Sequence, residues 1–396
     1  MMIRLALICC LIWPGMAAAL SIEQPTVWRG ELRFSETVRV APGAALTVEA
    51  GTTVHFSGGA LEVAGRLEAT EARFTGPNWQ GIVLKGVDSD TRLTDCLIDG
   101  ADTGVEAIGG APRLERLHLR GNRIGAQLGK KSTAILRDSH IEENSRAGLI
   151  VKDGAAPTLT GNLFAGNGLF GAYIVQAKPQ AFRDNRFAGQ PTGLKIANLG
   201  SDPEIIGNHF ERNEVAILVD KAARPTLTGN ILTGNGIALH LYRRADARVT
   251  GNRFADNKLA VLAEYSSYPK ITENDFSGNE RSLKLAFQSS AWEAANGAAA
   301  RAQESRQGVF GQGKRPDDGE RRWPPAPTDG TIDARDNWWG TAGTEELATA
   351  AGKDNPSFIL DGRDTPTFRD GGKDYPLDRV LFSPWRDRAA TGDLSP

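Results

Sequence analysis

Asparagine recurs along the chain at a nearly constant spacing. The intervals between Asn162, Asn185, Asn208, Asn230, Asn252 and Asn274 are 23, 23, 22, 22 and 22, and each asparagine stands in a segment similar to Pro-Thr-Leu-Thr-Gly-Asn-Xaa-Phe. A second amide column lies five positions downstream, at Asn167, Gln190, Asn213, Asn235, Asn257 and Asn279, and Asn122 and Asn144 extend it toward the N-terminus. Two amide columns in phase at this period predict coils stacked on one another.

One large apolar residue stands between the two amide columns in each repeat: Leu119, Ile141, Phe164, Phe187, Phe210, Leu232, Phe254 and Phe276. The short runs that follow, such as Val215–Val219 and Ile237–Leu241, alternate as strands with one buried face do. The Leu-x-x-Leu-x-Leu spacing of leucine-rich repeats is absent. We therefore predict an all-β fold, a right-handed parallel β-helix of roughly a dozen coils of about 22 residues each.

The asparagine columns have a structural explanation. Gly and Asn tolerate the left-handed backbone conformation that tight corners between strands require. At a strand spacing of about 4.8 Å, the side-chain amide of one coil can donate to the amide oxygen of the next. We therefore interpret Asn162, Asn185, Asn208, Asn230, Asn252 and Asn274 as a ladder that satisfies buried polar groups rather than as ligand donors.

The N-terminal residues 1–19 have the pattern of a secretory signal. Arg4 supplies the charge, Leu5 to Trp13 the short apolar core, and Ala17 to Ala19 the small residues before cleavage. We expect cleavage after Ala19 and a periplasmic or extracellular protein. The apolar run is too short to cross a bilayer, so no membrane insertion is expected after cleavage.

Cysteine content and charge exclude several classes of protein. Outside the predicted signal, Cys96 is the only cysteine, so the mature chain can form no intramolecular disulfide. Cys96 lies in a strand-like segment and is expected to be a buried thiol. The formal net charge of −2 gives no broad positive surface for nucleic acid. No nucleic-acid partner and no cofactor are therefore predicted.

The chain is expected to form one elongated domain after the signal. Residues 20–91 are predicted to form irregular first coils that cap the stack, and residues 92–288 the regular repeats. An insertion over 289–330 interrupts the last coil, and residues 331–396 complete that coil and the C-terminal cap. Irregular terminal coils would cover the open edge that a parallel stack otherwise presents.

The predicted insertion lies between two members of the first asparagine column. The interval from Asn274 to Asn337 is 63, whereas the intervals between the other members are 22 or 23. Ala291 to Arg306 is rich in Ala, Glu, Gln and Arg, which favour a short helix. Lys314 to Pro327 is basic and rich in proline. The repeat resumes with Asn337 in the ladder position and Trp339 in the stacked aromatic position.

The C-terminal segments Asn337–Thr341, Ile359–Asp364 and Val380–Trp385 resemble the tail of secreted bacterial right-handed β-helix repeat proteins. The repeats resemble the same broad pectin-lyase-like superfamily, which includes NosD-type copper-site maturation proteins and carbohydrate-active β-helix enzymes. The resemblance implies the fold. It also implies that Trp338, Trp339 and Trp385 cover the last coil rather than bind sugar.

Candidate functional residues lie on the outward face of the sheet that follows the second amide column. Alternation predicts one outward column of Lys195, Leu218, His240, Leu262 and Lys284 and a second of Ala197, Asp220, Tyr242, Glu264 and Ala286. Adjacent coils are expected to bring Asp220, Tyr242 and Glu264 within a few ångströms of one another, beside His240. The following turns carry Arg243, Arg244, Tyr265 and Tyr268.

This face allows an enzymatic hypothesis that resembles polysaccharide-cleaving β-helices. In a lyase or epimerase, Tyr242 or His240 would transfer the ring proton, while Lys284 or Arg243 would bind the uronate carboxylate. In a glycosidase, Asp220 and Glu264 would act as the carboxylate pair. The sequence lacks the dense outward Asp cluster of pectate lyases and the Asp-Pro-His-Glu motif of mannuronan epimerases.

The NosD-like alternative implies copper handling, which favours Cys, Met and His ligands. All three methionines lie in the predicted signal, and His55, His118, His140, His209 and His240 fall in different coils. His118 and His140 stand one repeat apart and can stack on neighbouring coils. No metal site is predicted.

We therefore expect a non-catalytic binding or scaffold module for an extended partner, either a polysaccharide or an envelope protein. The candidate binding residues are Lys195, Arg243, Arg244, Tyr265 and Tyr268. Two alternatives remain open: a carbohydrate-active enzyme that uses His240, Tyr242, Asp220, Glu264 and Lys284, and a periplasmic accessory protein for metalloenzyme maturation.

Overall fold

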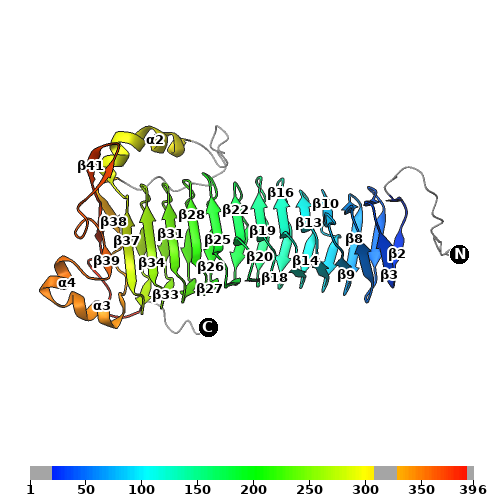
Figure 1. The fold of residues 1–396 in the computed structure, drawn as a ribbon, viewed down its shortest axis with the longest axis horizontal. Helices are drawn as coiled ribbons and strands as arrows, with labels where there is room; N and C mark the ends of the chain where they lie inside the picture. Colours follow the sequence, from blue (N-terminus) through cyan, green and yellow to red (C-terminus); the bar gives the residue numbers. More distant parts are fainter. Residues whose placement is uncertain (1–19, 307–327, 390–396) are drawn as a thin grey trace.

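A computed structural model describes residues 20–306 and 328–389. Three long parallel sheets run side by side, and each takes every third strand of the chain, so the backbone winds through the three sheets in turn (Figure 1). The longest sheets hold 14 strands. At about 4.8 Å per strand, the rod is about 62 Å long. The predicted all-β parallel β-helix is confirmed.

Sheet A contains β1 (Leu20–Ile22), β4 (Val38–Val40), β7 (Leu61–Val63), β10 (Ile82–Lys85), β13 (Thr103–Ile108), β16 (Ile124–Gly129), β19 (Ala147–Lys152), β22 (Phe170–Val175), β25 (Thr192–Ala197), β28 (Val215–Asp220), β31 (Ile237–Tyr242), β34 (Leu259–Glu264), β37 (Arg281–Ala286) and β39 (Ile359–Leu360). Its strands have three or four residues in the first four coils and six residues from β13 to β37.

Sheet B contains β2 (Thr26–Trp28), β5 (Ala45–Val48), β8 (Arg66–Thr70), β11 (Arg92–Thr94), β14 (Arg113–Glu115), β17 (Ile135–Arg137), β20 (Thr158–Thr160), β23 (Ala181–Arg183), β26 (Glu204–Ile206), β29 (Thr226–Thr228), β32 (Arg248–Thr250), β35 (Lys270–Thr272), β38 (Thr331–Asp333) and β42 (Arg379–Leu381). Sheet C contains β3 (Glu31–Phe34), β6 (Thr53–Phe56), β9 (Arg73–Thr75), β12 (Leu97–Asp99), β15 (His118–Arg120), β18 (His140–Glu142), β21 (Leu163–Ala165), β24 (Arg186–Ala188), β27 (His209–Glu211), β30 (Ile231–Thr233), β33 (Arg253–Ala255) and β36 (Asp275–Ser277).

The first asparagine column forms a continuous side-chain ladder at the corners of the coils, and the second forms one that is broken between Gln190 and Asn213. In the first column, each side-chain Nδ2 donates to the Oδ1 of the next asparagine at 2.9–3.1 Å, from Asn162 through Asn274 to Asn337. The second column makes the same bonds from Asn122 to Asn167 and from Asn213 to Asn279. Its Gln190 accepts from Asn167. The expected amide ladder is thus present, but the left-handed residue at each corner is the one before the asparagine, such as Gly161, Asp184 or Gly207.

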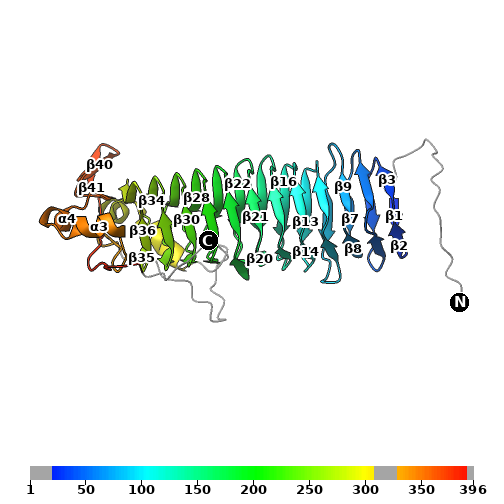
Figure 2. The same ribbon diagram turned by 90° about the horizontal axis from the view of Figure 1, so that it is seen from below.

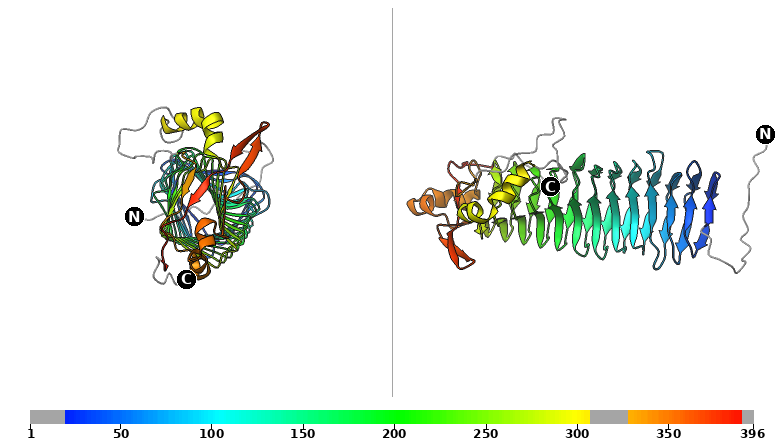
Figure 3. Two further views of the ribbon diagram at one scale, coloured as in Figure 1. Left: turned by 90° about the vertical axis from the view of Figure 1, so that its left-hand side faces the viewer. Right: turned by 90° about the horizontal axis from the view of Figure 1, so that it is seen from above.

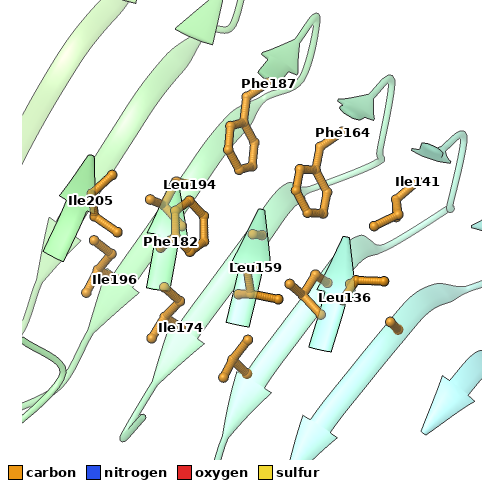
Figure 4. Packing of buried hydrophobic residues seen from close by; sticks show 14 of the residues in the cluster. Leu136, Ile141, Leu159, Phe164, Ile174, Phe182, Phe187, Leu194, Ile196 and Ile205 are labelled. Carbon is orange, nitrogen blue, oxygen red and sulfur yellow. The ribbon is translucent and has the colours of Figure 1, made fainter. Parts of the chain in front are cut away.

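The apolar column between the ladders lies inside the coil and forms a stack (Figure 4). The ring centroids of Phe164 and Phe187 are 4.6 Å apart, and those of Phe187 and Phe210 are 4.7 Å apart. At the C-terminal end the stack continues from Phe276 to Trp339 at 4.9 Å. Stacking of this kind favours the core because each ring buries both faces against its neighbours.

The expected helix after the last regular coil is present. It comprises α1 (Ser290–Trp292), a π-helical turn (Glu293–Gly297) and α2 (Ala298–Arg306), and it lies along one side of the rod (Figures 1 and 3). Buried Arg301 joins the helix to the coils by donating to Asp246 at 2.8 Å, and within the helical segment it donates to Glu293 at 3.1 Å. The expected proline-rich piece, Lys314 to Pro327, and the predicted signal, 1–19, lie outside the described residues.

The C-terminal end carries elements that the sequence did not predict. Helices α3 (Gly340–Leu347) and α4 (Ala350–Asp354) close the end of the rod, and the antiparallel hairpin of β40 (Thr367–Asp370) and β41 (Lys373–Pro376) projects from it (Figures 1 and 2). Trp339 is buried against Phe276 and Phe358. Among the residues that the structure describes, no helix combines the length and hydropathy needed to cross a bilayer.

Candidate binding surface

The outer face of sheet A is built from the six-residue strands. In β31, Ile237, His240 and Tyr242 are half-buried, whereas the three residues between them are buried in the core. The neighbouring strands β28 and β34 pair with β31 in register, so the same strand positions form columns along the rod. Residues that stand one repeat apart in the sequence therefore lie next to each other in one column of this face.

The outer face changes character along the rod. In the N-terminal half, the middle column is mostly polar and carries Arg39, Glu62, Val83, Glu106 and Gln127. From β19 to β34 the outward positions carry a set of half-buried apolar residues, here called the apolar strip: Ile150, Phe170, Tyr173, Val215, Leu218, Ile237, Leu259 and Leu262. Clustered apolar side chains at a surface mark interaction sites, because covering them releases the water they order.

The register places the candidate residues in the two expected outward columns. One runs through Lys195, Leu218, His240, Leu262 and Lys284, and the other through Ala197, Asp220, Tyr242, Glu264 and Ala286. Of these, Lys284 is exposed, while Ala197 and Asp220 are buried by their neighbours. Alternation alone therefore located the columns but not how far each side chain is covered.

Asp220 is held by cations from both neighbouring coils. Arg243 donates to its two carboxylate oxygens at 2.8 and 2.6 Å, and the Lys195 ammonium lies 3.9 Å away. The hydrogen bond to Asp220 raises the pKa of Arg243. Lys195 also lies over the rings of Phe170 and Tyr173. The charges of Asp220 and Lys195 thus have their partners among other residues of the same surface.

His240, Tyr242 and Glu264 also interact with one another and with Arg243. The His240 Nε2 lies 2.7 Å from a Glu264 carboxylate oxygen. The His240 and Tyr242 rings are 5.6 Å apart, and the Arg243 guanidinium lies 4.5 Å from the centre of the Tyr242 ring. The structure therefore brings the predicted residues together, but their charged groups already have partners in the protein.

The expected proximity of Asp220 and Glu264 is wrong. Tyr242 pairs with both, so the two acids lie two strands apart. Two strand spacings are about 9.6 Å, well beyond the roughly 5 Å separation of a retaining glycosidase and at the upper limit of the roughly 6.5–9.5 Å of an inverting one. The error came from treating Asp220, Tyr242 and Glu264 as neighbours on adjacent coils, although only successive members of that column are adjacent.

Five aromatic rings, beginning with Tyr242, continue this surface toward the C-terminal end, and we call them the outer aromatic row. Centroid distances are 5.2 Å from Tyr242 to Tyr265, 5.1 Å from Tyr265 to Phe287, 5.8 Å from Phe287 to Phe368 and 5.9 Å from Phe368 to Tyr375. Phe287 stands one repeat after Tyr265 and was detectable from the period. Phe368 and Tyr375 come from the hairpin, for which the repeat gives no signal.

Two further candidates differ from their expected positions. Tyr268 is buried, and its hydroxyl donates to Asp378 at 2.9 Å and lies 2.9 Å from the Ser290 hydroxyl, so it joins the core under the helix instead of binding a ligand. Burial raises the pKa of Tyr268. Arg244 is half-buried in the turn after β31. Tyr268 was misplaced because the sequence did not show that the insertion packs over this turn.

Metal-ligating side chains are dispersed over the described part of the chain, which holds no cluster of three or more His, Cys, Asp or Glu residues suited to a metal ion. His118 and His140 lie on neighbouring strands and meet edge to face, with ring centres 6.1 Å apart and planes at 78°, and His118 Nε2 lies 2.6 Å from Glu142. Cys96 is buried, which raises the pKa of its thiol to about 11.

Comparison with known protein families gives two overlapping matches. Residues 54–210 match the right-handed β-helix region, and residues 171–300 match the periplasmic copper-binding protein NosD. A search of curated proteins gives no match. Residues 171–300 contain no Cys or Met, and their two histidines, His209 and His240, lie in different coils and sheets. These residues do not fit copper, which favours clustered Cys, Met and His ligands.

Proposed function

From the premise that this chain belongs to the right-handed parallel β-helix repeat proteins, we propose that it is an exported, periplasmic binding module without catalytic activity. The outer face of sheet A from β19 to β34 binds an extended partner, a polysaccharide or an envelope protein. Export is supported by the signal-like residues 1–19 and by the description of the NosD family as periplasmic.

The apolar strip is the observation that carries this proposal. It crosses six strands, which cover about 24 Å along the rod, and three residue steps along each strand, about 10 Å. Its projected area is therefore roughly 240 Å², so its length along the rod, rather than its area, distinguishes it from scattered surface apolar residues. A narrow strip of this length suits an extended partner better than a broad globular face, which usually buries about 800 Å² on each side.

The pairing of the polar residues supports binding rather than catalysis. The Asp220 carboxylate is engaged by Arg243 and Lys195, and Glu264 by His240. A proton-transfer residue needs a partner on the substrate within hydrogen-bonding distance and a pKa near the working pH. Here Asp220, Glu264 and Arg243 lie at the edge of the apolar strip. Lys195 and His240, which pair with the two acids, lie in the same column as Leu218 and Leu262.

The proposal is tested with the mature chain, residues 20–396, on immobilised polysaccharides and immobilised extended peptides. We expect retention on one class of partner with no new reducing or unsaturated ends. Retention should fall in the double variant Leu218→Asp, Leu262→Asp, whereas Thr226→Asp, at a half-buried position on the outer face of sheet B, should bind normally. New ends, or binding that the Leu variant retains in full, would contradict the proposal.

The match to NosD over residues 171–300 favours a second candidate function, an accessory role for an exported metalloenzyme. Because the described residues do not fit copper, such a role would act through contact with a protein partner. Deleting the gene for this protein and measuring the metal content of the exported enzymes of the same cells tests this candidate. Unchanged metal content would eliminate it, and restoration by wild type but not by the Leu218→Asp, Leu262→Asp variant would support it.

A further inference from the structure

The turn that follows sheet A holds bulky aromatic residues in an unfavourable backbone conformation. The first residue after each strand has a positive φ, and in earlier coils it is Asp153, Gln176, Asn198, Lys221 or Arg243. In the last two regular coils the same position is Tyr265 and Phe287, each with φ of 51°. Asn and Asp tolerate this left-handed region, whereas it is costly for large side chains.

The rings of Tyr265 and Phe287 gain little burial in return for this conformation. Tyr265 is 37% exposed and Phe287 46% exposed. Both belong to the outer aromatic row, where they stack on each other with an angle of 11° between their planes. Every regular coil needs the positive φ at this turn position, so the fold explains the backbone conformation but not the choice of large exposed rings there. Strained residues of this kind are typical of functional sites.

Several polar groups beside the row are already bonded within the protein. Trp292 Nε1 donates to Asp370 at 2.7 Å, and Asn296 Nδ2 donates to the Tyr375 hydroxyl at 3.3 Å. Glu264 and Asp220 are occupied by His240 and Arg243. Fewer groups beside the row are therefore left to bond the hydroxyls of a sugar, whereas an apolar ligand would lose only ordered water.

We propose that the outer aromatic row and the adjoining apolar strip bind an extended apolar segment of another exported protein. This inference rests on the proposed binding function and names the class of its partner. The strip and the row together cover the strands from β19 to β37, about 29 Å, which is the length of about nine residues of extended peptide. Tyrosine, phenylalanine and arginine at such a surface are typical of the energetic centre of protein interfaces.

The test uses the mature chain and three probes: nine-residue peptides of Leu, Val, Phe and Pro with a lysine at each end, the same peptides with the apolar residues replaced by Ser, and neutral and uronic oligosaccharides. We expect binding to the apolar peptides only. The double variant Tyr265→Asn, Phe287→Asn should bind them roughly tenfold or more weakly, because exposed aromatic residues at interfaces carry much of the affinity.

The same double variant should melt at the wild-type temperature or above, because asparagine tolerates a positive φ. The matched control is Gln176→Asn, which makes the same kind of change at the same turn position, remote from the row. Equal peptide binding by the double variant and wild type would overturn the assignment to the row. Binding to oligosaccharides or to the Ser peptides would overturn the apolar partner but leave the binding function. New polysaccharide ends would overturn both.

Discussion

Asn208 occupies a central position in the first asparagine ladder, and replacing it with alanine tests what the ladder contributes. Its Oδ1 accepts from the backbone N–H and the side-chain Nδ2 of Asn185, both at 3.0 Å. Its Nδ2 donates to Asn230 Oδ1 at 3.1 Å and to the carbonyls of Phe182 and Ile206 at 3.2 and 3.1 Å. Asn208→Ala removes all of these bonds from a buried corner.

The expected cost follows from the groups that lose their partners. The Asn185 N–H and the Phe182 carbonyl lose bonds that Asn208 alone supplies at this corner. Leaving a buried polar group unsatisfied costs about 1–3 kcal/mol, so two such groups predict about 2–6 kcal/mol of local destabilisation. The lower value applies if water reaches the space left by the side chain.

Amide hydrogen exchange followed by mass spectrometry measures this cost coil by coil. In a stacked repeat each coil contacts only its neighbours, so the opening free energy should fall around β23 to β31 and stay unchanged near β10 to β16. Glu204→Ala, an exposed change in the same coil, is the control. If the opening free energy falls by less than about 0.5 kcal/mol, or falls evenly along the rod, the ladder does not contribute the stability assigned to it here.

Three further changes have expected outcomes. Arg301→Ala removes the buried cation shared by Asp246 and Glu293, so the helix should loosen by about 3–5 kcal/mol and be cleaved faster by protease between 290 and 306 than wild type. Phe187→Ala opens a cavity inside the ring stack and should destabilise nearby coils by about 3–5 kcal/mol in the same exchange experiment. Burial raises the pKa of Cys96 to about 11, so the thiol of the unfolded chain ionises first as the pH rises. The free energy of unfolding should therefore fall between about pH 9 and 11. Denaturant titrations should show a weaker fall in Cys96→Ala.

The fold could be predicted because its determinants repeat. Each asparagine of the ladder bonds the same groups one coil away, so the spacing of Asn162, Asn185 and Asn208 encodes the coil length directly. The strand alternation also predicted which columns face outward, including the one that carries His240. In contrast, α3, α4 and the hairpin occur once, and no period marks their contacts.

The binding surface was only partly predictable for the same physical reason. Tyr265 could be placed next to Tyr242 from the period, but its contact with the hairpin through Phe287 and Phe368 joins residues 81 positions apart. The burial of Tyr268 depends on Asp378, which is more distant still. Contacts between the repeat and a segment outside it produce no regular spacing in the sequence, so the sequence alone does not reveal them.

The bond from Asn274 to Asn337 has a consequence for how such a protein changes over time. It measures 3.0 Å, the same as the bond from Asn252 to Asn274, although the chain makes a much longer detour before it closes, an interval of 63 instead of 22. The geometry of the rod therefore does not depend on how much chain lies between these two corners. New segments can be acquired, lengthened or exchanged at this point by descent while the rod that displays them stays unaltered.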